Sequence, residues 1–444
     1  MMRERAAGLV LGLWALALSV ALAPTPADAA SRVEEVVSPG GIRAYLISEP
    51  MLPLLSVSVH FKGGSALDPP GKAGLANMVS GLLDEGAGEL DSQAFRTELE
   101  DRAVRLSFEA GRDEFTGSLK TLTEHRQRAF ELLRLALTEP RFDEEPVERI
   151  RSQIQADLRR RSEDPGYVAS QTWFETAFPD HPYGRPVRGT VESVAAIETQ
   201  DLRRFVQDRL VRDQMTIGVA GDVTAAELGP LLDLAFGDLP AGGPPIEVEA
   251  AVPAVSGTVV VRKPLPQSQV MFGEGGLMRS DPDYYAAYVA NHILGGGGFT
   301  SRLTDEVREK RGLAYSVYSY LYPTEFAPLW LGGAGTDSVR VGESLEIIRA
   351  EVARIAAGDI SAEELEDAKT YLTGSFPLRL TSNDQIAGML VGMQVHDLGI
   401  DYIDRRNDLI EAVTLEDLRR VAARLYDPEA LLTVVVGDPP GLEG

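Results

Sequence analysis

Hydrophobic residues recur along this chain with two periodicities, that of a β-strand and that of an α-helix. Strand-like alternation occurs at 55–59 and again at 268–272, and a helical pattern follows each of these runs, at 72–83 and at 284–294. Longer helical patterns lie near 124–162 and 338–396. Strands grouped with helices predict an α+β fold, in which antiparallel-rich sheets carry helices packed on one face.

The same order of elements occurs twice. The tetrapeptide Asp-Leu-Arg-Arg stands at 201–204 and at 417–420, and each copy leads through a strand-like run to Gly-Asp, at 221–222 and 437–438. Both pairs are 216 residues apart (201 to 417, 221 to 437). Prolines, glycines and acidic residues separate the copies. We therefore predict two homologous domains, at 31–239 and 257–444, joined by a linker at 240–256.

The N-terminal segment has the layout of a secretory signal peptide. Arg3 and Arg5 precede an uncharged, mostly apolar run at 6–23, and Ala-Asp-Ala at 27–29 supplies the small residues that a signal peptidase accepts. The alternative is an uncleaved anchor, because the run is just long enough to span a membrane. We favour cleavage of 1–29 and export to the periplasm, because the apolar run is rich in alanine and ends in a cleavage-like site. No second spanning run follows, so we expect no stable membrane insertion.

Composition narrows the classes of function. The 444 residues include 67 acidic and 43 basic side chains, five histidines and no cysteine, and the net charge is -24. Without cysteine there are no disulfides, thiolate metal sites or cysteine nucleophiles. A strongly acidic chain is a poor partner for nucleic acid, because affinity for phosphate backbones depends on clustered Lys and Arg.

Several short motifs in order resemble the pitrilysin/insulinase family of zinc peptidases. They are Gly-Lys-Ala-Gly-Leu-Ala at 71–76, His-Pro-Tyr-Gly at 181–184, Leu-Gly-Gly-Gly-Gly at 294–298 and Arg-Gly-Leu-Ala-Tyr-Ser at 311–316. The resemblance is to the small bacterial and mitochondrial-processing-peptidase type and covers nearly the whole mature chain. It implies a pair of α+β domains arranged as half a clamshell, with two such halves enclosing a peptide chamber.

The zinc motif that the resemblance implies is degenerate here. The family carries H-x-x-E-H on a helix, which places two His ligands and a Glu base on one face. Asn77, Ser80 and Gly81 stand at these three positions, and Asp157, 76 residues after Gly81, stands where the family has a Glu ligand. An amide, an unassisted hydroxyl and a glycine supply neither ligands nor a base. We expect no catalytic zinc in this chain.

The remaining histidines do not replace the missing motif. None of them lies three or four residues from another; they are His60, His125, His181, His292 and His396. A zinc site assembled by folding from scattered ligands is the alternative, but structural or surface roles are the better interpretation.

An Arg and a Tyr seven positions apart are the next feature that the resemblance singles out. Arg308 lies in a predicted helix at 304–311 and Tyr315 at the start of a predicted strand at 313–320. In the family these side chains hydrogen-bond the substrate carbonyl near the scissile bond, where such donors stabilise a developing oxyanion. The alternative is a surface ion pair of the Arg with a neighbouring Glu, and a Tyr that only packs on a sheet.

The glycine run that precedes this helix has three interpretations. The resemblance to the non-catalytic processing-peptidase subunit favours a flexible loop that touches peptide substrate. A phosphate-binding loop is disfavoured, because the G-x-x-x-x-G-K-[ST] pattern is absent. The third is a plain turn between helices. The residues concerned are Gly295, Gly296, Gly297 and Gly298.

Three functional hypotheses follow. The first is a subunit without zinc in a heterodimeric peptidase, in which an exported H-x-x-E-H partner binds zinc and this chain contributes Arg308 and Tyr315 to hydrolysis of peptides. The second is an inert peptide-binding or assembly protein of the same fold. The third, an autonomous zinc enzyme, requires ligands that the sequence lacks. We favour the first, because the metal-binding residues are gone while the substrate-orienting pair persists.

Overall fold

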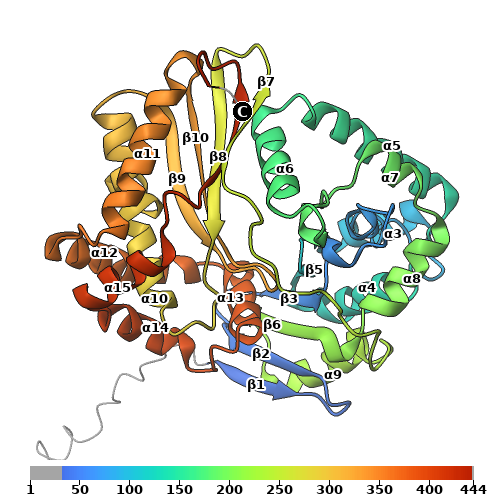
Figure 1. Ribbon diagram of the computed structural model, residues 1–444. Coiled ribbons are helices and arrows are strands. Elements are labelled where there is room, and N and C mark those ends of the chain that lie inside the picture. Colours follow the sequence, from blue (N-terminus) through green and yellow to red (C-terminus); the bar gives the residue numbers. More distant parts are fainter. Residues whose placement is uncertain (1–32, 443–444) are drawn as a thin grey trace, which may run out of the picture. The chain divides into compact units, whose positions relative to one another are not determined.

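Two β-sheets of matching strand order organise the chain (Figure 1). The computed structural model describes residues 33–442, so the signal peptide predicted at 1–29 lies outside the described residues. The first sheet has the order β1-β2-β6-β3-β5-β4 and the second β7-β11-β8-β10-β9. Neighbouring strands are antiparallel except in the pairs β2–β6 and β7–β11. The predicted antiparallel-rich α+β fold is therefore confirmed.

Each sheet has its own set of helices. The strands of the first sheet are β1 (Glu34–Val37), β2 (Arg43–Ser48), β3 (Leu54–Lys62), β4 (Arg105–Ala110), β5 (Glu114–Leu122) and β6 (Met215–Gly221). The helices of this half are α2 (Leu75–Ser80), α3 (Ser92–Asp101), α4 (Arg126–Thr138), α5 (Glu144–Arg161), α6 (Pro165–Ala177), α7 (Val191–Ala195), α8 (Thr199–Arg209) and α9 (Ala225–Phe236).

The second half repeats this arrangement. Its strands are β7 (Gly257–Arg262), β8 (Gln267–Gly275), β9 (Ala314–Tyr322), β10 (Leu329–Asp337) and β11 (Leu432–Gly437). Its α-helices are α10 (Tyr284–Asn291), α11 (Val341–Ala356), α12 (Ala362–Gly374), α13 (Asn383–Val395), α14 (Tyr402–Glu411) and α15 (Leu415–Leu425). One face of this sheet shares a buried apolar cluster, which includes Phe272 and Trp330, with α10, α11 and α15.

The repeated Asp-Leu-Arg-Arg tetrapeptide begins equivalent helices. Asp201 in α8 and Asp417 in α15 each occupy the third helical position and complete a capping box that satisfies free backbone N–H groups. The leucine that follows each Asp is fully buried. The matched strand orders and the matched helix starts therefore have the same cause, which is a repeated structural unit.

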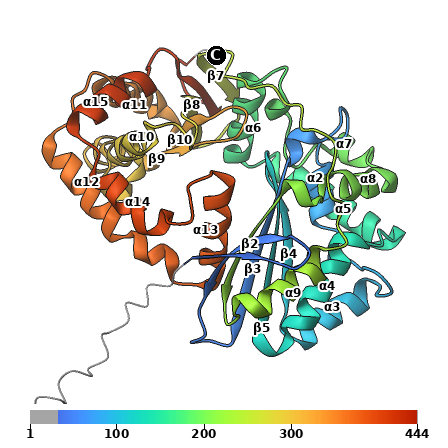
Figure 2. The same cartoon turned by 90° about the horizontal axis from the view of Figure 1, so that it is seen from below.

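Each half also sends one helix to the sheet of the other half. Helix α13 packs on β6 and β3 of the first sheet, and α6 packs on β11 and β8 of the second; Figures 1 and 2 show both helices beside these strands. The indole N–H of Trp173 in α6 donates to the carbonyl of Leu432 at 3.0 Å. Gly218 on β6 lets α13 approach closely, because a Cβ there would lie 2.2 Å from the carbonyl oxygen of Ala387.

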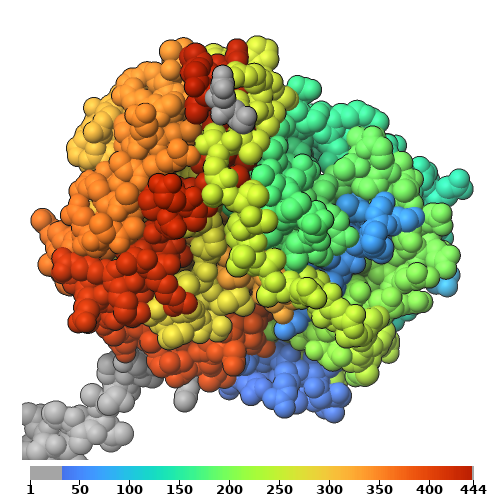
Figure 3. Space-filling view, in the orientation of Figure 1, coloured from blue at the N-terminus to red at the C-terminus, as the bar shows by residue number. Residues whose placement is uncertain are grey.

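The segment at 240–256, predicted as the linker, has no helix or strand of its own. Its residues are exposed or half-buried, and it runs over the surface as the yellow-green chain in Figure 3. Backbone hydrogen bonds hold it at both ends. The carbonyls of Pro240 and Ala241 accept from the N–H groups of Arg212 and Asp213, and the N–H groups of Ala251 and Ala254 donate to the carbonyls of Phe326 and Ala177.

Candidate functional site

Helix α2 contains Asn77 and Ser80, and Gly81 is its C-cap; these are the three positions at which the resemblance implies the zinc motif. The first turn of α2 is held by the buried carboxylate of Asp68, which accepts hydrogen bonds from the N–H groups of Gly74, Leu75 and Ala76 at 2.8, 3.1 and 3.0 Å. The helix ends at Ser80, whose hydroxyl donates to the carbonyl of Asn77 at 2.9 Å. The helix thus stops where the family motif requires its second ligand.

Asp157 on α5 faces the same place. Asn77 and Asp157 line one cavity of about 180 Å³, together with Arg188. The carboxylate of Asp157 is paired with Arg160 and, at 2.6 Å, with Nε of Arg161. The hydrogen bond from Arg161 lowers the pKa of Asp157. Of the four positions derived from the family motif, Asn77 and Asp157 therefore meet at one cavity. Arginine side chains pair with the carboxylate there and compensate its charge.

This donor set does not fit a zinc ion. Catalytic zinc sites use three protein ligands drawn from His, Cys, Asp and Glu, whereas the cavity offers one carboxylate that guanidinium groups already neutralise. Within residues 33–442, no group of three or more His, Asp or Glu side chains is placed to hold a metal ion. We derive no chemical step through a metal bound to this chain.

Arg308 and Tyr315 lie together. Arg308 is in a short π-helix, Thr304–Glu309, and the chain turns at Gly312, with φ of +59°, into strand β9. The guanidinium carbon of Arg308 is 5.5 Å from the ring centre of Tyr315 and 4.8 Å from that of Phe299. Tyr315 is 79% exposed and Phe299 71% exposed. The three side chains form an exposed cluster, which we call the Arg–Tyr–Phe cluster.

A β-bulge sets the position of Tyr315. In the register of β9 with β10, Ser316 lies opposite Gly335 and Ala314 lies opposite Thr336, so Tyr315 is the extra residue. Bulges re-aim side chains and are common beside functional sites. The bulge therefore places the Tyr315 ring outside the regular alternation of the strand, beside Arg308.

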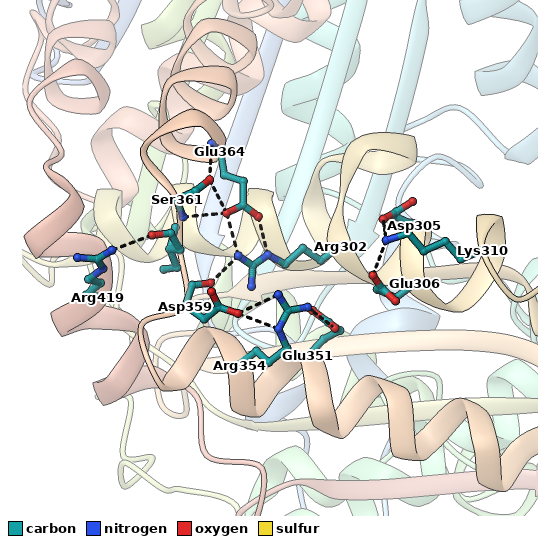
Figure 4. Close-up of polar contacts among 11 residues, drawn as sticks. Arg302, Asp305, Glu306, Lys310, Glu351, Arg354, Asp359, Ser361, Glu364 and Arg419 are labelled. Carbon is teal, nitrogen blue, oxygen red and sulfur yellow. Dashed lines mark hydrogen bonds and ion pairs between the residues drawn. The ribbon is translucent and has the colours of Figure 1, made fainter.

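Ion pairs fix the helical segment that carries Arg308. At its start, the guanidinium of Arg302 binds both carboxylate oxygens of Glu364, at 2.6 and 2.8 Å (Figure 4). Glu306 is paired with Lys310 and Arg311, so it does not neutralise Arg308. Arg308 does contact the carboxylate of its neighbour Glu309, at 3.4 Å, as in the surface ion pair that was the alternative from the sequence.

The glycine run, predicted as a flexible loop, lies in helical turns, His292–Gly296 and Gly298–Thr300, and packs against β9 and α10. A Cβ at Gly295 would lie 2.4 Å from the hydroxyl of Ser319 on β9, and one at Gly296 would lie 2.7 Å from the side chain of Asn291. Gly298 has φ of +60°, a conformation that glycine adopts without strain. Close packing and backbone geometry explain these three glycines, and contact of residues 295–298 with substrate stays a prediction.

The His-Pro-Tyr segment at 181–183 packs inside the chain. The phenol of Tyr183 is fully buried and donates to the carboxylate of Asp113 at 2.6 Å. The ring Nδ1 of His181 accepts a hydrogen bond from the N–H of Tyr183 at 3.1 Å. These contacts agree with the structural or surface role expected for His181.

Sequence reasoning missed two cavities beside α13. One, of about 260 Å³, is lined by Arg279, Arg379 and Arg406, and the other, of about 550 Å³, includes His60. Both cavities share Arg279. No spacing signal marks these residues, because they come from separate elements and meet only after α13 has docked on the first sheet.

Comparisons with known proteins agree on one family. Residues 43–191 match the family described as Insulinase (Peptidase family M16), and residues 196–372 match the Peptidase M16 inactive domain. A non-peptidase homolog of Helicobacter pylori is 28% identical over 341 residues, which are 77% of this chain and 78% of that protein. An uncharacterized zinc protease of Streptomyces coelicolor is 28% identical over 415 residues, 91% of this chain and 89% of that protein.

Solved structures show the same fold. A peptidase M16 inactive domain from Pseudomonas fluorescens superimposes with a TM-score of 0.86 at 26% identity, over 93% of this chain and 99% of that one. A chain of complex III from Candida albicans has a TM-score of 0.77 at 18% identity, over 93% and 97% of the two chains. In the part of this chain that the structure describes, no helix has the length and apolar character needed to cross a membrane.

Proposed function

The chain belongs to the insulinase (M16) peptidase family, and we propose that it is the subunit without zinc of a heterodimeric peptidase. A second exported chain with an intact H-x-x-E-H motif binds the zinc ion and supplies the general base. This chain supplies Arg308 and Tyr315, which orient the peptide bond to be cut. The complex works in the periplasm, where the predicted signal peptide directs this chain.

The observation that carries this proposal is the contrast between two places in the chain. At the degenerate metal position, Asp157 is neutralised by arginines and no ligand set remains. At the Arg–Tyr–Phe cluster, the guanidinium of Arg308 and the exposed ring of Tyr315 are held 5.5 Å apart. The groups needed to bind a metal are missing, whereas the two groups proposed to orient the substrate lie together and are accessible.

The chemistry of the pair suits substrate orientation. A guanidinium and a phenol are both hydrogen-bond donors, and donors fixed before the reaction stabilise the negative charge that develops on the carbonyl oxygen of a peptide. Phe299 lies against the same guanidinium and adds apolar surface at the cluster. The glycine run at 295–298 precedes Phe299 in sequence and is the proposed contact with the rest of the peptide.

Reconstitution with the partner tests this proposal. Each chain alone should be inactive, and the mixture should hydrolyse a fluorogenic peptide. Tyr315→Phe should lower turnover by about 10²-fold, the effect of removing one oxyanion donor. Tyr45→Phe is the matched control, because it also removes one phenol hydroxyl but lies on β2, away from the cluster. Full activity of the partner alone would contradict the proposal.

The second candidate is a peptide-binding or assembly protein that takes no part in hydrolysis. The Helicobacter pylori relative is a non-peptidase homolog, which favours this candidate. It differs in one measurable outcome: the complex would be fully active with Tyr315→Phe, while binding of peptide or partner would still depend on this chain.

A further inference from the structure

A cationic cavity lies where α13 meets α10 and α14. It has a volume of about 260 Å³, and its charged lining residues are Arg279, Arg379 and Arg406, with His396 beside them. No lining residue is acidic. In a chain with a net charge of -24, three arginines around one small space without a carboxylate are unusual. The cavity therefore has the charge expected of an anion-binding site.

Aromatic rings hold the central arginine in place of a carboxylate. The guanidinium of Arg279 lies 4.2 Å from the ring centre of Tyr284, and it donates hydrogen bonds to the hydroxyls of Tyr285 and Tyr402 at 2.9 and 3.0 Å. These contacts use one of its two terminal nitrogens. Among residues 33–442, no carboxylate lies within 4.0 Å of this guanidinium, so its charge is available to a ligand.

A second, more deeply buried arginine closes the cavity. Arg406 is 4% exposed, stacks over Phe376 at 4.4 Å, and donates to the carbonyl of Leu372 at 2.8 Å. Its neighbour Arg405 differs in both respects, since it is exposed and paired with Asp401 at 2.7 Å. The arginine that turns inward therefore lacks the carboxylate partner that the outward one has.

Two glycines of α13 keep this space open. Gly388 and Gly392 stand one turn apart in the helix, and a Cβ at either would meet nothing within 4 Å. Close packing therefore does not explain the two glycines, although a glycine inside a helix costs about 1 kcal/mol relative to alanine. Both line the cationic cavity and the neighbouring cavity of about 550 Å³. The missing side chains of Gly388 and Gly392 leave room for these two cavities.

The neighbouring cavity connects this region with strand β9. His60, which is 8% exposed, lines it, and its Nδ1 is buried without a hydrogen-bond partner in the described residues. Tyr322 also lines it and is the last residue of β9. From there Tyr320 and Tyr318 follow along one face of the strand, with ring centres 6.3 and 6.2 Å apart, toward Tyr315.

We infer that the cationic cavity binds the C-terminal carboxylate of a peptide whose preceding residues run along the tyrosines of β9. This inference rests on the proposed function, in which the ligand is a peptide. A guanidinium binds a carboxylate through charge-assisted hydrogen bonds, and the second terminal nitrogen of Arg279 still has donors for one. The aromatic walls suit the last side chain of the peptide, and the distance from Tyr322 to Tyr315, seven residues of strand, is about 23 Å.

The decisive comparison is between two forms of one peptide. A decapeptide of glycine and serine that ends in leucine is labelled with fluorescein at its N-terminus and made as the free acid and as the amide. Fluorescence anisotropy with the full-length chain should show at least about tenfold tighter binding of the acid, since the amide loses a charge-assisted hydrogen-bonded pair. A third peptide, an amide that ends in glutamate, tests whether a side-chain carboxylate serves equally well.

Two variants locate the effect. Arg279→Gln should abolish the preference for the acid, whereas Arg405→Gln, the matched control on an exposed arginine, should keep it. Gly392→Leu fills the cavity while leaving the arginines in place and should also abolish the preference, so the test does not depend on the folding of one variant. Thermal denaturation shows that each variant is folded.

The possible outcomes separate the two proposals. Equal binding of acid and amide to the unaltered chain, or a preference that survives Arg279→Gln, overturns the carboxylate site but leaves peptide binding intact. Equal binding of the glutamate amide and the free acid overturns recognition of the peptide terminus. Failure of all the peptides to bind overturns this inference, whereas the proposed function is tested separately by reconstitution with the partner.

Discussion

Glu274 makes the stability of this protein depend on pH. It lies on β8, is 5% exposed, and accepts hydrogen bonds from the N–H of Asp427 at 3.1 and 3.2 Å. No Lys or Arg lies within 4.0 Å of its carboxylate among the described residues. Burial raises the pKa of Glu274 from 4.5 to about 8, and the hydrogen bond from Asp427 only partly offsets this effect. The folded chain therefore holds a proton that the unfolded chain releases.

The sign and size of the effect follow from this difference. Between about pH 4.5 and pH 8 the folded state binds more protons than the unfolded state, so the free energy of unfolding falls as the pH rises through this window. Each pH unit contributes about 1.4 kcal/mol, so the fall reaches roughly 5 kcal/mol at pH 8 and roughly 3 kcal/mol at pH 7. The contribution is fully present below pH 4.5.

Glu274→Gln removes this titration and keeps a carbonyl oxygen for the N–H of Asp427. We expect the variant to be more stable than the unaltered chain at pH 8.5 and close to it at pH 5, with a flatter dependence between them. Melting temperatures at four pH values measure this. Glu429→Gln, an exposed residue of the same region, is the control and should leave the slope unchanged. Parallel pH profiles for Glu274→Gln and the unaltered chain would refute the reasoning.

Two further predictions concern the docking of α13 and the lost metal site. Gly218→Ala should destabilise the protein by about 1–3 kcal/mol, because the new Cβ would lie 2.2 Å from the carbonyl oxygen of Ala387. Gly392→Ala, whose Cβ meets nothing within 4 Å, should instead stabilise it by about 1 kcal/mol. Denaturant midpoints in the opposite order would contradict the docking of α13 on the first sheet. Restoring the family ligands should give a folded chain with about one zinc per molecule by elemental analysis, and a folded variant without zinc would show that the positions do not converge. The four substitutions are Asn77→His, Ser80→Glu, Gly81→His and Asp157→Glu.

Local patterns in the sequence predicted the repeated unit for a physical reason. The duplicated Asp-Leu-Arg-Arg includes a helix-capping Asp and a buried Leu, so its recurrence marks the same helix start twice, in α8 and α15. The exchange of α6 and α13 between the sheets was not predictable in this way. It depends on close approaches at Gly218 and Gly273, and a glycine in a strand has several possible causes.

The candidate site, too, was predictable only where its position depends on residues close in sequence. The helix, the glycine stop and the strand start that place Arg308 near Tyr315 were visible from residues close in sequence. The bulge that re-aims Tyr315 was not, because it depends on the register with β10. Phe299 and Arg279 were missed for a similar reason: an exposed Phe and an arginine packed on tyrosines acquire meaning only from neighbours that folding supplies.

Helix α2 keeps its local fold although the residues at the expected zinc positions do not form a ligand set. Helix α2 is anchored by the carboxylate of Asp68, and the guanidinium of Arg185 donates to the carbonyls of Asp68 and Ala66 at 2.6 and 2.8 Å. None of these contacts involves a metal position, so the helix keeps its place without an ion. The arginines at Asp157 complete this change, since they compensate the charge that a cation would otherwise balance. The first half thus keeps its fold without an ion, and the proposed function accordingly rests on the second half, at Arg308 and Tyr315.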